Sequence, residues 1–392
     1  MPTLQPGTRV QALDVLRGLV IVLMALDHVR DYFHESGYAY DPLDPALTTG
    51  ALYVTRWVTH FCAPTFVFLA GVSAWLQGAK GKDPARLARF LITRGLWLLL
   101  LEWTVIGFCW SFSIPFLLPF QVIWAIGVSM IVLAALIHLP RGAVFAIALV
   151  IVTGHNLLDP IRAAQFGDWA WAWYLLHERG PLTWNGTVIG LAVYPVLAWI
   201  GVMALGYALG PVFVSPRRDR TLVRISLGMI VLFLLLRTFN VYGDPAPWAP
   251  QDTTSKTVMA FFNVQKYPPS LLYLCATLGP MLLLVPAFER LRGPVASFFR
   301  TYGAVPLMAY VSHLLVMHLV ALGAHAAAGH NLTGMFNTIH YFFFEPDVFA
   351  GSSFPLWVSY VAWIAVLAII YPLCRWWGDV KRRRRDWWLS YL

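Results

Sequence analysis

Charged residues are scarce in this chain of 392 residues, and their scarcity excludes an ordinary soluble domain. Only 12% of the residues are charged, against about 25% in soluble globular proteins, while 59% are hydrophobic. Cysteine is also rare, and the four cysteines lie apart in apolar stretches, so neither a disulfide framework nor a metal site is expected. The absence of HExxH, GxSxG and Walker patterns argues against metal or serine-hydrolase chemistry, and the absence of an internal repeat argues against an inverted-repeat transporter.

Long apolar segments recur along the chain, between its few charged residues. They predict an all-α, polytopic membrane helix bundle of about ten transmembrane helices, in a single domain over residues 1–392. The expected spans lie near residues 13–33, 52–77, 91–112, 119–139, 142–158, 185–210, 221–240, 268–288, 303–325 and 354–377. The first stretch has no small-residue cleavage site, so we expect a retained span and no cleaved signal peptide.

Basic residues divide unevenly between the alternating loops, with 21 on one side and 7 on the other. The positive-inside rule therefore predicts that both termini lie in the cytoplasm. We expect an integral, multi-pass protein of the inner (plasma) membrane. Arg9, Lys82 and the run 381–385 belong to the basic side. Residues 378–392 are expected to form a basic cytoplasmic tail bound to anionic lipid. This distribution explains the net charge of +9 and argues against nucleic-acid binding.

The first apolar stretch carries Arg17 and His28 with ten residues between them. That separation is nearly three helical turns, so both side chains share a face, roughly 16 Å apart along the axis. Inside a membrane such side chains persist only when they are buried in protein or face water. The pair therefore suggests a reaction path across the bilayer.

Acidic residues accompany both members of this pair. Asp14 lies three residues before Arg17 and can pair with it, either as a structural ion pair or beside a phosphate-bearing group. Gly18 would allow close approach of another helix or a ligand. His28 is a candidate general base that Asp31 could orient from three residues away.

The roles of His28 itself and of two residues near it stay open. Asp27 is adjacent in sequence but points about 100° away on the helix. The His28 side chain could instead be structural, with its hydrogen bonds made to neighbouring helices. His34, at the helix end, is a weaker candidate for the base.

Further polar residues occur at depth in other spans. His60 either faces His28 or is structural, and Pro64 frees the carbonyl of His60 from its helix bond. Lys266 precedes the doubled proline 268–269 and either snorkels to the interface or lines the site.

A transporter is the rival class. In that alternative Arg17, His28, Glu102 and His313 would form a substrate and proton pathway. His313 and His318 lie about 140° apart on their helix, so they cannot jointly ligate one metal ion.

Five stretches of the chain resemble a known family. Residues 13–34, 59–76, 123–136, 261–280 and 302–318 resemble the DUF1624 proteins, which share the heparan-alpha-glucosaminide N-acetyltransferase catalytic domain. The Arg17–His28 spacing is also similar to that of the wider transmembrane acyltransferase group, which includes the Acyltransferase 3 enzymes. The lysosomal branch carries Asn where His28 stands and its active histidine further on, and His34 is not at the same spacing.

The resemblance implies a membrane enzyme that uses cytoplasmic acetyl-CoA, or another acyl-CoA, to acylate an amine or hydroxyl of an extracytoplasmic sugar or glycan. The donor phosphates would lie near Arg17, with further donor-binding candidates at Asp14, Arg86, Arg89 and Lys266.

The catalytic candidates have their own expected roles. His28, oriented by Asp27 or Asp31, would take a proton from the acceptor, and His60 or Lys266 would stabilise the oxyanion. Direct transfer is favoured, and an acyl-histidine intermediate stays open, as do the acceptor and a homodimer.

Overall fold

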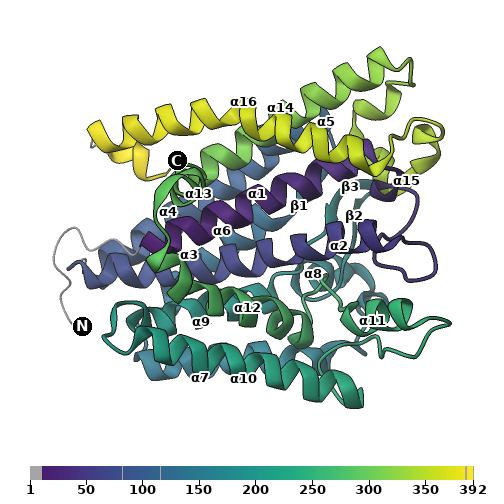
Figure 1. Cartoon of the computed structure of the whole chain (residues 1–392). Helices are drawn as coiled ribbons and strands as arrows, with labels where there is room; N and C mark the ends of the chain where they lie inside the picture. Colours follow the sequence, from purple (N-terminus) through teal and green to yellow (C-terminus); the bar gives the residue numbers. More distant parts are fainter. Residues whose placement is uncertain (1–10, 82, 115, 385, 392) are drawn as a thin grey trace.

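Helices make up most of the described chain, which comprises residues 11–81, 83–114, 116–384 and 386–391 of a computed structural model (Figure 1). The α-helices are α1 (Gln11–Phe33), α2 (Gly50–Val58), α3 (Cys62–Ala79), α4 (Pro84–Leu101), α5 (Gly107–Ser111), α6 (Val122–Leu136), α7 (Arg141–Gly154), α8 (Ala170–Leu176), α9 (Leu197–Leu209), α10 (Arg218–Phe239), α11 (Thr254–Phe262), α12 (Leu271–Arg290), α13 (Gly293–Gly303), α14 (Pro306–Ala327), α15 (Thr338–Phe344) and α16 (Leu356–Arg383). Arg9, Lys82 and Arg385 lie outside the described residues. The C-terminal segment from residue 378 begins as the last turns of α16.

Each of the ten expected spans contains a helix. Eight helical segments of the described chain are long and apolar enough to cross a membrane: Gly50–Ala79, Pro84–Ser111, Arg141–Leu158, Leu197–Val214, Arg218–Phe239, Leu271–Arg290, Pro306–Ala327 and Leu356–Arg383. The other two expected spans are α1, which carries five charged residues among its 23, and the shorter α6. The prediction of an all-α, polytopic membrane bundle is confirmed.

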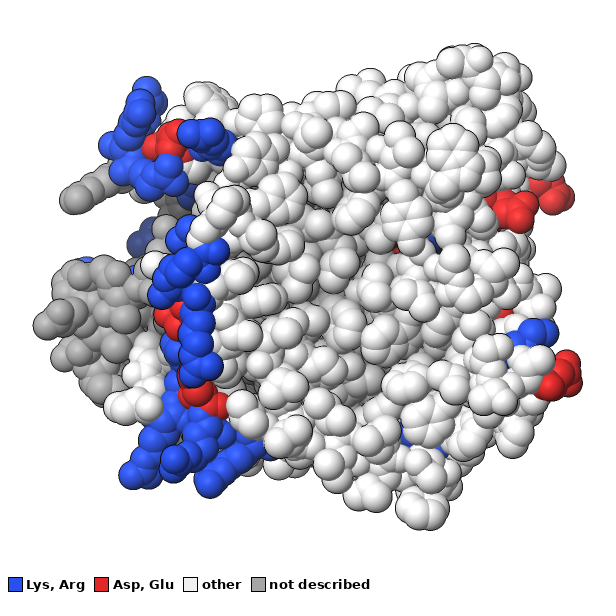
Figure 2. Space-filling view, in the orientation of Figure 1, with Lys and Arg blue, Asp and Glu red and all other residues white. Residues whose placement is uncertain are grey.

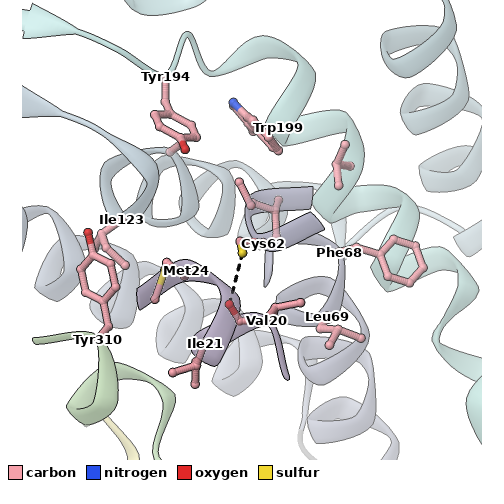
Figure 3. Packing of buried hydrophobic residues seen from close by; sticks show 14 of the residues in the cluster. Val20, Ile21, Met24, Cys62, Phe68, Leu69, Ile123, Tyr194, Trp199 and Tyr310 are labelled. Atoms are coloured by element: carbon pink, nitrogen blue, oxygen red, sulfur yellow. Dashed lines mark hydrogen bonds between the residues drawn. The ribbon is translucent and has the colours of Figure 1, made fainter. Parts of the chain in front are cut away.

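Helix α1 lies inside the bundle and packs against α3, α12, α13, α14 and α16 (Figure 1). Gly18 makes the approach to α13 close, because a Cβ there would overlap the carbonyl oxygen of Phe299. The expectation that Gly18 permits close helix packing is thus confirmed. Across the α1–α3 contact, Cys62 Sγ donates a hydrogen bond to Val20 O at 3.2 Å (Figure 3). Because protein surrounds α1, its charged side chains can avoid lipid.

A small sheet corrects the expected start of the sixth span, which the hydropathy placed at residue 185. Strands β1 (Leu118–Phe120), β3 (Thr187–Ala192) and β2 (Gly180–Trp184) lie side by side in that order. β3 pairs in parallel with β1 and antiparallel with β2. Asn185 and Gly186 have positive φ angles and join β2 to β3, as expected of a tight hairpin turn. The helix of this span therefore begins at Leu197.

Charge separates the two ends of the molecule. Figure 2 shows lysine and arginine gathered at the end where α16 finishes, and a broad uncharged surface beyond them. We call this the basic end, and the opposite end, which carries the sheet and the long loops, the loop end. The uneven distribution of basic residues that the sequence predicts is therefore visible as a difference between the basic end and the loop end.

Candidate active site

A cavity of about 640 Å³ lies at the loop end, and we call it the loop-end cavity. His28 of α1 and His60 of the 3₁₀ turn η2 (Thr59–Phe61) belong to its wall. Its charged lining residues are Arg30, Arg56, Arg179, Lys266, Asp27, Asp31 and Asp41. Polar groups thus converge inside an otherwise apolar bundle, which is a typical arrangement of a binding or catalytic site.

Asp27 is the centre of the charge network in this cavity. Its carboxylate accepts hydrogen bonds from Arg30 Nη2 at 3.1 Å and Arg56 Nη1 at 3.4 Å. Lys266 Nζ lies 3.9 Å from its Oδ2 atom. Arg30 also donates to Asp31 at 2.6 Å. Because a buried charge is tolerated only when it is paired, these contacts explain how five ionic side chains persist at this depth.

The segment that carries Lys266 is fixed by a second carboxylate, Asp244. Its Oδ2 atom accepts hydrogen bonds from the Gln265 backbone N at 2.8 Å and from Ser270 Oγ at 2.7 Å. Arg237 Nη1 lies 3.8 Å from Oδ1. Burial raises the pKa of Asp244, and these hydrogen bonds and Arg237 oppose the rise. Lys266 is thereby held at the cavity wall, since its neighbours are anchored on both sides.

His28 pairs with another histidine. Its Nδ1 atom lies 2.8 Å from Nε2 of His313 on α14, and the two rings stack with centroids 5.0 Å apart. His313 Nδ1 lies 3.1 Å from the carbonyl oxygen of Ala309. Because that oxygen can only accept, His313 Nδ1 carries the proton and its Nε2 is an acceptor. His28 must then donate from Nδ1, which leaves a lone pair on its Nε2 atom.

The same reasoning gives His60 the opposite tautomer. Arg56 Nη1 lies 3.2 Å from His60 Nδ1, and a guanidinium group can only donate. His60 therefore carries its proton on Nε2, a buried atom with no hydrogen-bond partner among the described residues. The carbonyl oxygen of His60 accepts from Tyr273 Oη at 2.8 Å, which confirms that Pro64 leaves it free for another partner. The cavity thus presents one imidazole acceptor and one imidazole donor.

A second cavity, of about 290 Å³, lies at the basic end, and we call it the basic-end cavity. Its cationic lining residues are Arg17, Arg94 and Lys381. Arg17 Nη1 donates to Asp14 Oδ1 at 3.2 Å, which confirms the expected ion pair. Its other terminal nitrogen donates to Ser73 Oγ on α3. Arg17 is therefore fixed across the α1–α3 contact with its guanidinium at the cavity wall.

The two cavities adjoin inside the bundle. Met24, Phe66 and Val122 line both of them, and we call these three residues the neck. Figure 3 shows Met24 of α1 beside Ile123 and Tyr310, which also line the basic-end cavity. The neck residues therefore lie between a space at the basic end and the cavity that contains His28.

The structure brings together five of the predicted site residues, namely Asp27, His28, Asp31, His60 and Lys266, in the loop-end cavity. Their chemical roles stay predictions. Lys266 differs from its expected grouping, because it lies with His28 and not with Arg17. The expected carboxylate partner of His28 also differs: among the described residues Asp27 and Asp31 bond to arginines, and His28 bonds to His313.

Four other predicted residues line neither cavity. Arg86 and Arg89 are exposed at the start of α4, and neither lines a described cavity. His34 is half-buried and caps the turn η1 (Glu35–Gly37), accepting from the Ser36 backbone N at 3.1 Å. The fourth is Asp14, whose carboxylate accepts a hydrogen bond from Arg17, a residue of the basic-end cavity wall.

Sequence reasoning missed the partners that orient the two histidines. Arg56 precedes His60 by four residues, and that spacing is a usable signal because it places two side chains on one face of a helix. His313 lies 285 positions from His28, so no local pattern could pair them. Arg94 and Lys381 likewise reach the basic-end cavity from distant helices.

A bundle of apolar helices with histidines, carboxylates and cations buried in a cavity defines a polytopic membrane protein with an internal polar site. The family model described as "Heparan-alpha-glucosaminide N-acetyltransferase, catalytic" matches residues 9–237, which is more than half of the chain. The chain belongs to this family and is a membrane acetyltransferase. A search of the curated proteins finds no match. Lys266, which lines the loop-end cavity, and His313, which bonds to His28, lie beyond the matched residues.

Proposed function

We propose that the chain transfers an acetyl group from cytoplasmic acetyl-CoA to an amine or hydroxyl of an extracytoplasmic sugar or glycan. The observation that carries this proposal is the pair of cavities that adjoin at the neck beside His28. In this orientation the basic end faces the cytoplasm of the inner membrane, in keeping with the positive-inside rule. Donor and acceptor then approach the reacting atoms from opposite sides.

The donor side is the basic-end cavity. Acetyl-CoA carries phosphates, and Arg17, Arg94 and Lys381 supply cationic donors where those phosphates would lie. The long pantetheine arm suits the mostly apolar path from Arg17 past the neck to His28, which extends over roughly 16 Å of α1. Arg86 and Arg89 would then contribute only attraction at the surface.

The acceptor side is the loop-end cavity. His28 Nε2 takes the proton from the acceptor amine or hydroxyl as the acceptor atom attacks the thioester carbonyl carbon. The new C–N or C–O bond forms, the C–S bond breaks, and the proton on His28 passes to the leaving thiolate, giving CoA. His60 Nε2–H, and Lys266 beside it, donate to the oxyanion.

Purified protein in nanodiscs, supplied with acetyl-labelled acetyl-CoA and a panel of amino sugars and neutral sugars, tests this proposal. We expect label to appear on at least one acceptor, in proportion to CoA released. Binding of acetyl-CoA without transfer to any member of the panel would narrow the acceptor class. Absence of both binding and transfer would overturn the proposal.

Transport is the second candidate, because two adjoining cavities at opposite ends also suit alternating access. The polar pathway would then contain Arg17, His28, His313 and the buried Glu102. Flux of an unmodified solute into protein-containing liposomes, with no change in acetyl-CoA, would favour this alternative.

A further inference from the structure

Two histidines and one aspartate meet at the loop end, outside both cavities. His155 begins the 3₁₀ turn η4 (His155–Leu158) after α7, Asp159 follows that turn, and His177 follows α8. One ligand atom from each residue lies within 4.8 Å of the other two. His177 Nε2 is already 3.0 Å from Asp159 Oδ1. Tetrahedral zinc ligands lie roughly 3.3 Å apart, so small side-chain rotations would close this set around one ion.

The hydrogen bonding of this cluster is incomplete. His155 is 2% exposed, yet neither of its ring nitrogens has a hydrogen-bond partner among the described residues. His177 is 3% exposed, and its Nδ1 atom is also without such a partner. Leaving a buried polar atom without a hydrogen-bond partner is unfavourable, so three such atoms in one cluster require an explanation. A cation bound between the rings supplies one.

Neighbouring residues prepare the carboxylate. Asn156 Nδ2 donates to Asp159 Oδ2 at 2.8 Å, and Asn156 Oδ1 accepts from the Leu271 backbone N at 2.9 Å. The amide therefore orients the aspartate and joins it to the first turn of α12. Outer contacts of this kind are typical around metal ligands, whose geometry they fix. Asp159 keeps part of its surface exposed, which leaves an approach from water.

We infer that His155, Asp159 and His177 bind a divalent transition-metal ion, with Zn²⁺ as the ion of best fit. Two imidazoles and one carboxylate suit zinc, and a water molecule would complete four ligands. The ion would join the end of α7 to the segment before β2. That segment carries Arg179, which lines the loop-end cavity two residues after His177. The site is structural in this account, and it does not depend on the proposed acetyl transfer.

Metal content and thermal unfolding of the full chain test the inference. The protein is purified in nanodiscs through an affinity tag without histidine, dialysed against Zn²⁺, and freed of loose metal by gel filtration. We expect about one zinc per chain and a fall of about 5 °C in the unfolding temperature after chelation, restored by Zn²⁺. Co²⁺ in place of Zn²⁺ should give the visible absorption of a four-coordinate site.

Two ligand variants and one matched control complete the experiment. His155→Gln and Asp159→Asn should each weaken Zn²⁺ binding at least about 100-fold and abolish the response to chelator. His340→Gln breaks an exposed histidine–carboxylate pair, to Glu345 at 3.0 Å, and should leave one zinc per chain. Wild-type protein that holds no zinc after dialysis, shows no cobalt spectrum and unfolds identically with and without chelator would overturn the inference. Equal zinc in wild type and both ligand variants would overturn it as well.

Discussion

The loop-end and basic-end cavities share α1 as a wall, but the side chains they bury differ in kind. The loop-end cavity has about 640 Å³, seven ionic side chains and two histidines. The basic-end cavity has about 290 Å³, mostly apolar walls and three cations. The first contains groups that can exchange protons, held in place by ion pairs. The second offers a passage with anion-binding groups. Loss of chemistry and loss of donor binding should therefore map to different cavities.

The largest expected effect comes from His28→Ala. Removing the imidazole acceptor should lower kcat for acetyl transfer about 10²–10⁴-fold, the usual contribution of a positioned general base. Binding of acetyl-CoA, measured by calorimetry, should stay within about twofold, because Arg17 and the basic-end cavity are untouched. Transfer at the wild-type rate would contradict the assignment of the base. A loss of acetyl-CoA affinity as large as the loss in kcat would contradict the assignment of chemistry and donor binding to different cavities.

A smaller loss in kcat should follow from changes at His313, which acts through His28. His313→Leu removes the acceptor that fixes the His28 tautomer and should lower kcat about 10–100-fold. His313→Gln retains an acceptor on a side chain of similar reach, so it should recover most of that loss. Rescue by Gln separates positioning from packing, since both variants disturb the core. Equal defects in the two variants would indicate a role in packing alone.

Changes at the basic end should appear in KM for the donor. Arg17→Gln removes a cation from the wall and should raise KM for acetyl-CoA about 10-fold, with kcat changed less. Arg89→Gln is the matched control, because Arg89 is exposed at the same end and lines neither described cavity. Its KM should change less than about twofold at 0.15 M salt. Equal effects of the two substitutions would place the phosphates at the surface.

The neck should determine which acyl chain lengths the enzyme accepts in its donor. Phe66→Ala removes a ring from the point where the cavities adjoin, and it should raise the kcat/KM ratio of butyryl-CoA to acetyl-CoA about 10-fold. Competition between the two donors with one acceptor measures this ratio directly. Phe90→Ala is the control, since Phe90 lines the basic-end cavity away from the neck. An unchanged ratio for Phe66→Ala would show that the acyl group does not pass this point.

Most of the helical framework was predictable because lipid requires long apolar helices. The sheet was missed because residues 185–196 are apolar enough to extend a span, although Asn185-Gly186 is a recognisable hairpin turn. The relative places of Arg17 and His28 followed from helical periodicity alone. Spacing within one helix therefore predicted which side chains share a face of that helix.

Spacing within one helix could not predict the contacts between helices. His28 could be recognised as costly at depth, but its partner lies on α14, and the carboxylates expected beside it bond to Arg30 and Arg56. The cluster of His155, Asp159 and His177 was missed for a related reason. Only its first two residues are one helical turn apart, and folding supplies the third.

The smallest expected effect belongs to His34, and it decides which histidine is the base. His34 lies outside the lining of the loop-end cavity and caps the turn η1 through its Nδ1 atom. His34→Ala should therefore lower the free energy of unfolding by about 1 kcal/mol or less, through loss of the cap, and leave kcat within about twofold. The acetyl-transfer assay used for His28→Ala measures kcat, and an unfolding measurement gives the change in stability, each against the same wild type. A loss in kcat of about 10²-fold or more in His34→Ala would show that the base is His34, in the loop after α1, and not His28. The hydrogen bonds from Ala309 through His313 that fix the His28 tautomer would then have no role in catalysis.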